Sequence, residues 1–121
     1  MTLKEAQYLI KHIELGTLEE KEDTRTAIEK KDNIQRLVLK LIEEFGELAE
    51  NIRKNARYTG ESIKGTVEEE AFDIFYYIIA IANEYDIDLE KVFLMKDKLN
   101  QENSNSEFSF VEAREMYKKV K

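Results

Sequence analysis

The fold class of this chain is decided by the stretch Leu41-Ile42-Glu43-Glu44-Phe45-Gly46-Glu47-Leu48-Ala49-Glu50. Its apolar residues recur every three or four positions, which is the period of one buried face of an α-helix. The same period extends on both sides of the stretch, through Ile34, Leu37, Val38, Leu41, Phe45, Leu48 and Ile52. We therefore predict a long helix that begins near Asp32, with Gln35 three residues on, and ends near Lys54.

A second long helix is predicted over residues 66–85. Thr66 and Glu69 form the capping-box pattern that opens many helices. Between residues 71 and 82 every side chain except that of Asp73 is apolar or aromatic, so this helix should be buried on most of its sides. Together the two segments predict an all-α bundle built around two long antiparallel helices.

Three shorter helices are expected around this pair, at about residues 3–14, 88–100 and 109–120. Capping-box patterns open the first and the last of them, and Gly16 is a plausible end for the first. Residues 17–31 are densely charged and fit either a loop or a short exposed helix.

The length of the chain favours one domain. With 121 residues, we expect a single domain over 1–121, in which a polar linker at 103–106 precedes the short last helix. A domain of this size buries only part of its apolar surface, and the predicted helix at 66–85 is more apolar than one short bundle can cover. We therefore expect self-association, as a homodimer or homotetramer.

The composition excludes several classes of protein. There is no cysteine, so disulfides and thiolate metal sites are impossible, which agrees with a cytoplasmic protein. No apolar segment has the length that a signal peptide or a membrane span requires, so we expect no membrane partner. The net charge of −7 argues against binding a nucleic-acid polymer. A single nucleotide stays possible, because a bound divalent metal ion can supply positive charge.

Two acidic pairs on the two long helices are the strongest functional signal. Glu44 and Glu47 are three residues apart, as are Glu70 and Asp73, so the members of each pair project to the same side of a helix. If the helices pack antiparallel, four carboxylates meet at the seam between them. Oxygen ligands of this kind suit Mg²⁺, with Mn²⁺ as the alternative.

Exposure to solvent is the simpler explanation for any one acidic pair in a chain so rich in glutamate. This explanation fits Asp73 badly, because an unpaired carboxylate in an apolar helix costs several kcal/mol or takes up a proton. Gly46 adds to the metal interpretation if another helix or a ligand approaches it closely, although a helix can also simply tolerate a glycine.

The sequence around the acidic pairs resembles that of the MazG-like all-α nucleoside triphosphate pyrophosphohydrolases. The similarity consists of Glu-x-x-Glu, 22 intervening residues and Glu-x-x-Asp, together with the flanking stretches at 41–50, 69–76 and 82–90 and the opening at 2–7. It covers roughly residues 3–100 and is poorest at 16–31. The complete four-carboxylate pattern with its flanks is specific, whereas either half alone is not.

The resemblance implies hydrolysis between the α- and β-phosphates of a nucleoside triphosphate, which gives a nucleoside monophosphate and pyrophosphate. It implies that the metal ligands are Glu44, Glu47, Glu70 and Asp73. It also implies that Tyr77, Lys96 and Asn100 contact the substrate. Related enzymes often carry an Arg-Tyr pair after that asparagine, and this chain has Gln101-Glu102 instead, which leaves the far side of the phosphate site in doubt.

The chemistry of the residues agrees with this reaction. A carboxylate next to the ligands, either Glu43 or Glu47, is in position to take a proton from the attacking water, and the sequence does not decide between the two. No serine or cysteine nucleophile arrangement is visible, so we prefer direct attack by water. The single histidine, His12, excludes a ferritin-like di-iron site, which needs two Glu-x-x-His motifs.

Two other kinds of protein stay open as alternatives. One is a helical interaction module without enzymatic activity, and the other is a pyrophosphatase of a biosynthetic nucleotide such as phosphoribosyl-ATP. For the remaining polar side chains we prefer structural roles. Lys40 is expected to form an ion pair with Glu44 one turn away, and Tyr8 and His12 to be a packed pair of rings.

Overall fold

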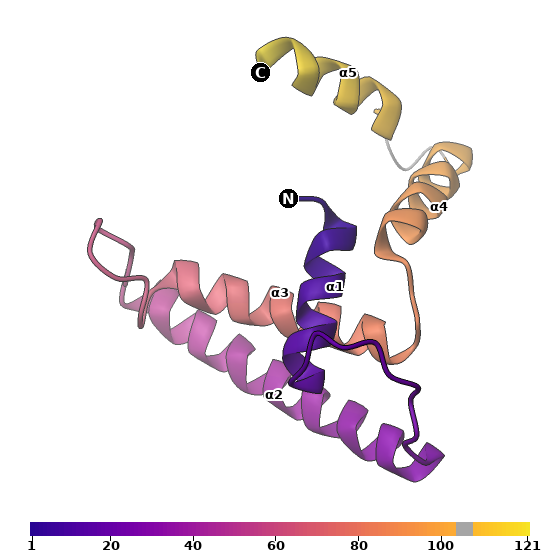
Figure 1. Ribbon diagram of the computed structural model, residues 1–121. Helices are drawn as coiled ribbons and strands as arrows, with labels where there is room; N and C mark the ends of the chain where they lie inside the picture. Colours follow the sequence, from indigo (N-terminus) through magenta and orange to yellow (C-terminus); the bar gives the residue numbers. More distant parts are fainter. Residues whose placement is uncertain (104–107) are drawn as a thin grey trace. The chain divides into compact units, whose positions relative to one another are not determined.

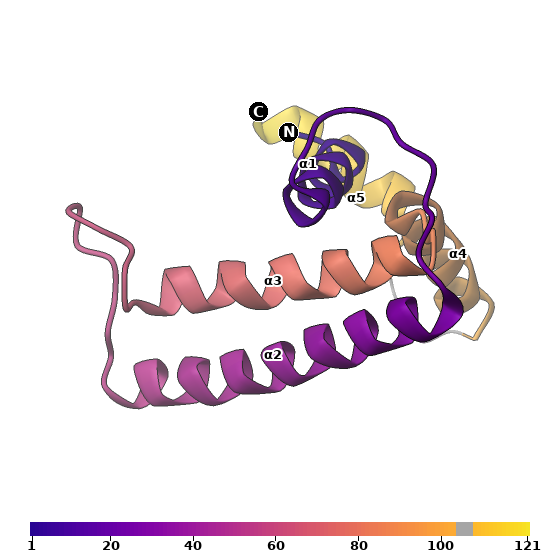
Figure 2. The ribbon, with the colours of Figure 1, turned by 60° about the horizontal axis from the view of Figure 1, so that its bottom comes forward.

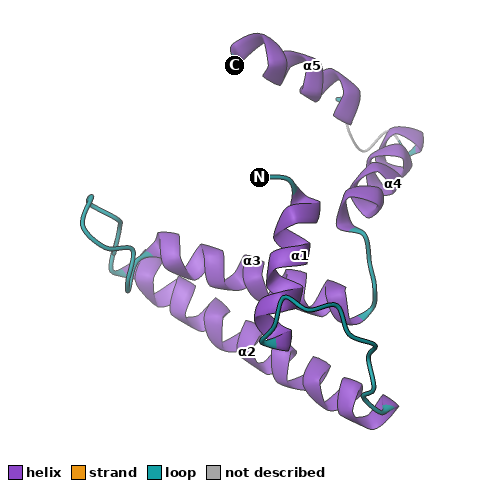
Figure 3. Cartoon of the chain, in the orientation of Figure 1, coloured by secondary structure: helices purple, strands orange, loops and turns teal. Residues whose placement is uncertain are grey.

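The computed structural model describes residues 1–103 and 108–121. These residues form five α-helices and no strand, which confirms the all-α prediction (Figures 1 and 3). They belong to two compact units, Met1–Asp86 and Ile87–Lys121.

The first unit contains three helices, α1 (Leu3–Leu15), α2 (Ala27–Arg53) and α3 (Val67–Glu84). Helices α2 and α3 lie side by side and antiparallel, and α1 packs against α3 (Figure 2). A small apolar core holds the three helices together, with α3 in the middle. Its fully buried apolar residues are Ala6, Ile10, Leu37, Ile79, Ala80 and Ala82.

Side-chain caps fix where the helices begin. Thr2 and Glu5 form the expected capping box of α1, and Gly16 ends that helix in the left-handed conformation, with a φ of 75°. The predicted start of α2 at Asp32 is wrong, because the helix begins five residues earlier, at Ala27. There Thr26 and Glu29 form a complete capping box, which satisfies the first backbone N–H groups.

Residues 16–26 connect α1 to α2 and contain no helix, so the charged segment is a loop up to Thr26. Arg25 anchors the end of this connector. Its guanidinium donates to both oxygens of the Glu84 carboxylate, at 2.8 and 2.9 Å, and Asn33 donates to the same carboxylate at 3.2 Å. Burial raises the pKa of Glu84, but these hydrogen bonds outweigh it and hold the pKa below the ordinary value.

The second unit contains α4 (Leu89–Glu102) and α5 (Phe110–Val120). The ring of Phe93 meets that of Phe110 edge to face, with centroids 5.4 Å apart, and Asp97 accepts a hydrogen bond from the backbone N–H of Phe110 at 3.0 Å. The predicted capping box of the last helix is confirmed at Ser109 and Glu112. Of the linker predicted at 103–106, residues 104–106 lie outside the described residues.

Helix α3 is less buried in a single chain than its composition predicts. Phe72, Phe75 and Ile78 follow one another at three-residue spacing and keep about half of their surface exposed. The expectation that α3 is covered on most sides is therefore wrong for one chain, because the extensive packing on it within the described residues comes from α1 and α2. Within the described ranges, no helix combines the length and the apolar character needed to cross a membrane.

Candidate functional site

The acidic residues of the two long helices converge on the seam between α2 and α3. Glu44 comes from α2, and Glu70 and Asp73 come from the first two turns of α3. One carboxylate oxygen from each of the three lies within 4.8 Å of the others. Three hard oxygen donors at this separation can ligate one divalent cation. The antiparallel packing of α2 and α3 creates this cluster, since residues 26 positions apart in sequence meet across the seam.

Burial makes the cluster unusual for a group of acids. Glu70 has only 5% of its surface exposed, and Glu44 and Asp73 are partly buried. The Oε2 atoms of Glu44 and Glu70 are both buried without a hydrogen-bond partner. Buried polar atoms are nearly always hydrogen-bonded, so two unpartnered oxygens in one cluster mark a place that a cation would suit.

The electrostatics of the cluster agree with this interpretation. Hydrogen bonding to Glu70, burial and the negative charges of Glu70 and Glu47 raise the pKa of Glu44. The hydrogen bond with Glu44 lowers the pKa of Glu70, but burial and the charges of Glu47 and Asp73 outweigh it and leave that pKa raised. Burial and the neighbouring acids also raise the pKa of Asp73. A cation would relieve all three effects.

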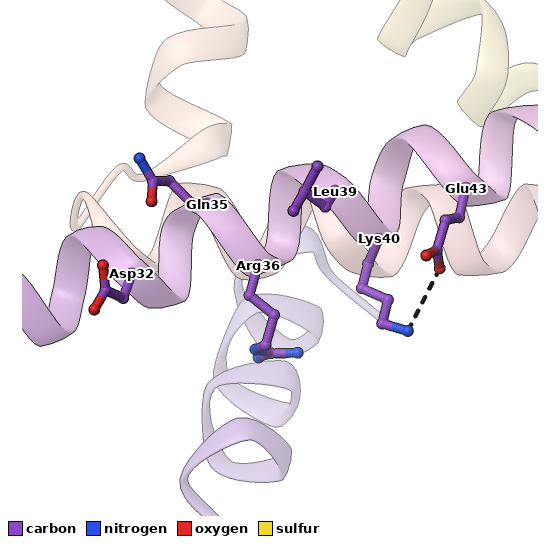
Figure 4. Close-up of a pocket in the computed structure, with 6 residues that line it drawn as sticks. All are labelled: Asp32, Gln35, Arg36, Leu39, Lys40 and Glu43. Atoms are coloured by element: carbon purple, nitrogen blue, oxygen red, sulfur yellow. Dashed lines mark hydrogen bonds and ion pairs between the residues drawn. The ribbon is translucent and has the colours of Figure 1, made fainter.

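The two proton-acceptor candidates occupy different places. Glu47 lies beside the cluster, where its charge acts on Glu44, Glu70 and Asp73. Glu43 lies outside the three-residue group and forms an ion pair with Lys40, with 3.4 Å between Nζ and Oε2 (Figure 4). Lys40 thus pairs with Glu43, not with Glu44 as expected.

A shallow hollow of about 440 Å³ lies along the side of α2 that carries Lys40 and Glu43. It is open to solvent, and all of its lining residues come from this one helix (Figure 4): Asp32, Gln35, Arg36, Leu39, Lys40 and Glu43.

The three expected substrate contacts are divided between the two units. Tyr77 lies one turn after Asp73 on α3 and is partly buried. Burial, together with the charges of Glu44 and Asp73, raises the pKa of its phenol, which places the ring in the field of the cluster. Lys96 and Asn100 lie four residues apart on α4, in the second unit, so they share one side of that helix.

One polar junction next to the cluster was missed by the sequence analysis. Tyr76 donates a hydrogen bond from its hydroxyl to Glu14 of α1, and Arg36 of α2 donates to the other oxygen of the same carboxylate at 3.1 Å. The junction joins all three helices of the first unit. No local pattern could have revealed it, because its members lie 22 and 62 residues from Glu14 in sequence.

Gly46 does not mark a close approach within the chain. A Cβ atom built at this position would meet nothing within 4 Å, apart from the backbone of the helix itself. The structure of one chain therefore supports the simpler interpretation, in which α2 tolerates a glycine on an exposed surface.

Comparisons with known proteins agree with the geometry. The family model of the MazG nucleotide pyrophosphohydrolase domain matches residues 32–106. Two crystal structures of iMazG from Vibrio DAT 722 are each 35% identical to this chain, with TM-scores of 0.64 and 0.65. They cover 84% and 88% of this chain, and 99% and 100% of their own.

A third match to iMazG from the same Vibrio is 40% identical over 60% of this chain and 92% of that chain, with a TM-score of 0.55. Among curated proteins no match was found. The family match spans α2 from residue 32, all of α3 and every acidic residue of the cluster, and the solved structures share the fold at more than 30% identity. The chain therefore belongs to the MazG nucleotide pyrophosphohydrolase family.

Proposed function

We propose that this protein is a Mg²⁺-dependent nucleoside triphosphate pyrophosphohydrolase that releases a nucleoside monophosphate and pyrophosphate. The observation that carries the proposal is the buried cluster of Glu44, Glu70 and Asp73, in which two carboxylate oxygens lack a partner. Membership of the MazG family supports the reaction class. The proposed role is control of the nucleotide pool, by removal of an ordinary or damaged triphosphate.

The residues at the seam fit a hard divalent ion. All of the donors are carboxylate oxygens, which Mg²⁺ and Mn²⁺ prefer, and the group contains no histidine or cysteine that would favour a softer metal. We propose Glu44, Glu70 and Asp73 as ligands, and Glu47 as the fourth because its charge acts on all three. Mg²⁺ bound there would make a bound water more acidic and neutralise charge on the phosphates.

The protein itself must supply a group that accepts the proton of the attacking water. Both Glu43 and Glu47 are candidates, and their surroundings favour Glu47. Glu47 lies beside the cluster, whereas the Glu43 carboxylate is paired with Lys40. A carboxylate that binds the metal through one oxygen keeps a second oxygen for the proton of a neighbouring water, so position, not basicity, favours Glu47. The variants Glu47→Gln and Glu43→Gln test this preference, and we expect the larger loss of turnover from Glu47→Gln.

Substrate binding is proposed for Tyr77 on α3 and for Lys96 and Asn100 on α4. Tyr77 lies within the electrostatic reach of Glu44 and Asp73, which supports a role next to the phosphates. Lys96 carries a positive charge on an exposed side chain, and Asn100 shares its side of the helix. A lysine ammonium is a common point-charge partner for phosphate.

The apolar surface of the first unit supports assembly into a homodimer or homotetramer. Phe72, Phe75 and Ile78 form an exposed stripe on α3, and Ile42 and Phe45 are exposed on α2. Helical faces of this kind are usually covered in a stable protein, and a symmetric second copy is the commonest cover.

The decisive experiment measures products from a panel of ribo- and deoxyribonucleoside triphosphates, with Mg²⁺ and with EDTA. We expect a nucleoside monophosphate and pyrophosphate in equal amounts, and only when the metal is present. In water labelled with ¹⁸O, the label shows which phosphorus atom the water attacks. Release of orthophosphate and a diphosphate would reject the proposed bond, and absence of any hydrolysis across the panel would favour a non-enzymatic role.

A further inference from the structure

The only histidine of the chain is buried at the junction of α1 with the connector at residues 16–26. The side chain of His12 has 1% of its surface exposed. Its Nδ1 atom lies 2.7 Å from the backbone oxygen of Thr17, and its Nε2 atom lies 3.2 Å from Oε1 of Glu20. Both ring nitrogens therefore face an oxygen atom of the connector.

The chemistry of these two oxygens determines which form of the ring fits. A carbonyl oxygen only accepts hydrogen bonds, so Nδ1 must carry a proton to interact with Thr17. An ionised carboxylate also only accepts, so Nε2 must carry a second proton to interact with Glu20. Neutral imidazole has one N–H group, whereas the imidazolium ion has two. The arrangement therefore fits the charged form of His12.

We propose that His12 is a pH-sensitive latch that holds residues 17–20 against α1 while its ring is doubly protonated. When the ring loses a proton, Nδ1–H keeps its bond to Thr17, because that geometry is the shorter of the two. Nε2 then presents a lone pair to the Glu20 carboxylate, and two acceptors face each other. Glu20 has a side chain that is 65% exposed, so it turns into solvent and the segment opens.

The charged surroundings of the ring support this switch. Lys11 on α1 lies 3.7 Å from the other oxygen of Glu20, so this carboxylate faces a lysine as well as the imidazole. His12 lies in the last turn of α1, where the helix dipole favours a cation. The Tyr8 ring packs against the imidazole, with centroids 4.4 Å apart.

Helix α3 also packs against α1, but its polar contacts go to other residues. Asn83 binds Gln7, and Tyr76 binds Glu14.

The opposite end of the connector is held by groups that do not titrate near neutral pH. Arg25 keeps its charge at any physiological pH, and the Glu84 carboxylate that it binds is stabilised in the ionised form. Loss of the His12 proton should therefore open only residues 18–22, beyond the retained contact at Thr17, and leave the helices packed.

Two NMR measurements on the full chain test the latch. The ¹⁵N shifts of the single histidine ring report whether both nitrogens are protonated at pH 5.5, as we expect. Amide hydrogen exchange, corrected for the intrinsic pH dependence, should then show that the protection factors of residues 18–22 fall about threefold as the pH rises from 5.5 to 8.5.

Two matched variants make the test specific. Glu20→Gln removes the charged acceptor from an exposed position, so the variant should fold, show low protection at pH 5.5 and change little with pH. Glu19→Gln is the control, because Glu19 pairs with Lys21 and not with His12. Its pH profile should match that of the parent. A singly protonated ring at pH 5.5, or an unchanged profile in Glu20→Gln, would overturn the proposal.

Discussion

The carboxyl groups of Glu44 and Glu70 meet across the seam between α2 and α3, and each keeps a buried Oε2 atom without a hydrogen-bond partner. Two helices of a small domain would not place acids in this way for stability alone, because buried unpartnered carboxylates are destabilising. The arrangement therefore predicts that a cation binds at the seam and stabilises the folded protein.

Asp73→Asn should lower nucleoside triphosphate cleavage by roughly two to three orders of magnitude, about 3–4 kcal/mol of transition-state stabilisation. The substitution keeps the shape of the side chain and removes the charge of a proposed ligand. The fold should survive, because it loses one of several mutually repelling acids. Steady-state kinetics with pyrophosphate detection measure the loss.

Asp86→Asn is a suitable control for that experiment. Asp86 is exposed and has a φ of 53°, a left-handed conformation that asparagine adopts readily. Glu68, a first-turn acid outside the cluster, is a poorer control. It forms an ion pair with Arg57 at 3.1 Å, so its substitution would also remove a structural contact. If Asp73→Asn keeps near-normal turnover, the proposed location of the site is wrong.

Addition of Mg²⁺ or Mn²⁺ should raise the melting temperature, and EDTA should lower it, because an ion that binds only the folded protein stabilises that state. Glu44→Gln should respond oppositely in the two conditions. Without metal it should melt higher than the parent, since one repelling charge is gone, and with metal it should gain less. Differential scanning fluorimetry over millimolar Mg²⁺ measures both effects. A melting temperature of the parent that does not change with Mg²⁺ would contradict the metal site.

In EDTA, the protein should lose stability as the pH rises from about 4.5 to about 8. The pKa of Glu44 is raised from an ordinary value of 4.5 to about 8 in the folded state, so folding favours its protonated form. That preference is fully present below the unfolded pKa and is lost as the pH rises through the folded pKa. Urea unfolding at several pH values checks the slope, which should flatten in Glu44→Gln. A slope of the opposite sign would show that the cluster does not control the pH dependence.

Sedimentation at micromolar concentration should show a dimer or a tetramer of the 14.3 kDa chain. Phe75→Glu should shift this equilibrium towards monomer, because it places a charge in the exposed stripe of α3. Ile28→Glu is the matched control, since Ile28 is more exposed, at 73%, and lies in the first turn of α2, outside the stripe. A parent protein that sediments only as monomer would disprove the assembly.

Arg25→Ala should lower the free energy of unfolding by about 2 kcal/mol, because it leaves the Glu84 carboxylate partly buried and without its ionic partner. Adding Glu84→Gln to this variant should recover part of the loss, since a neutral amide costs less to bury. Urea unfolding of the parent, the two single variants and the double variant gives the coupling energy. Additive losses would mean that the two side chains act independently.

Local sequence determined the helices and their ends where a single strong signal was present. The capping box of Thr2 and Glu5, the one of Ser109 and Glu112 and the stop at Gly16 are all confirmed. The start of α2 was misplaced, because Thr26 and Glu29 lie in a charged segment without apolar period, and periodicity gives no boundary there. Cap chemistry, which acts over three residues, was the better guide to that boundary than the apolar face.

The candidate site was only half determined by the sequence. The three-residue spacing of Glu44 and Glu47, and of Glu70 and Asp73, already required each pair to share a side of its helix. Which oxygens become buried and unpartnered depends on the rotation and separation of α2 and α3. The Lys40–Glu43 ion pair lies within α2 at a spacing of three residues, so the sequence allowed it as readily as the expected pair with Glu44.

Contacts between segments far apart in the chain were decided by the tertiary structure alone. Arg25 meets Glu84 across 59 positions, and Tyr76 meets Glu14 across 62. His12 meets Glu20 only because the connector folds back over the end of α1. Helical period and cap chemistry act within a few residues, so they cannot specify contacts of this kind. Hydrogen bonds and burial act between whichever groups the packing of the three helices brings together.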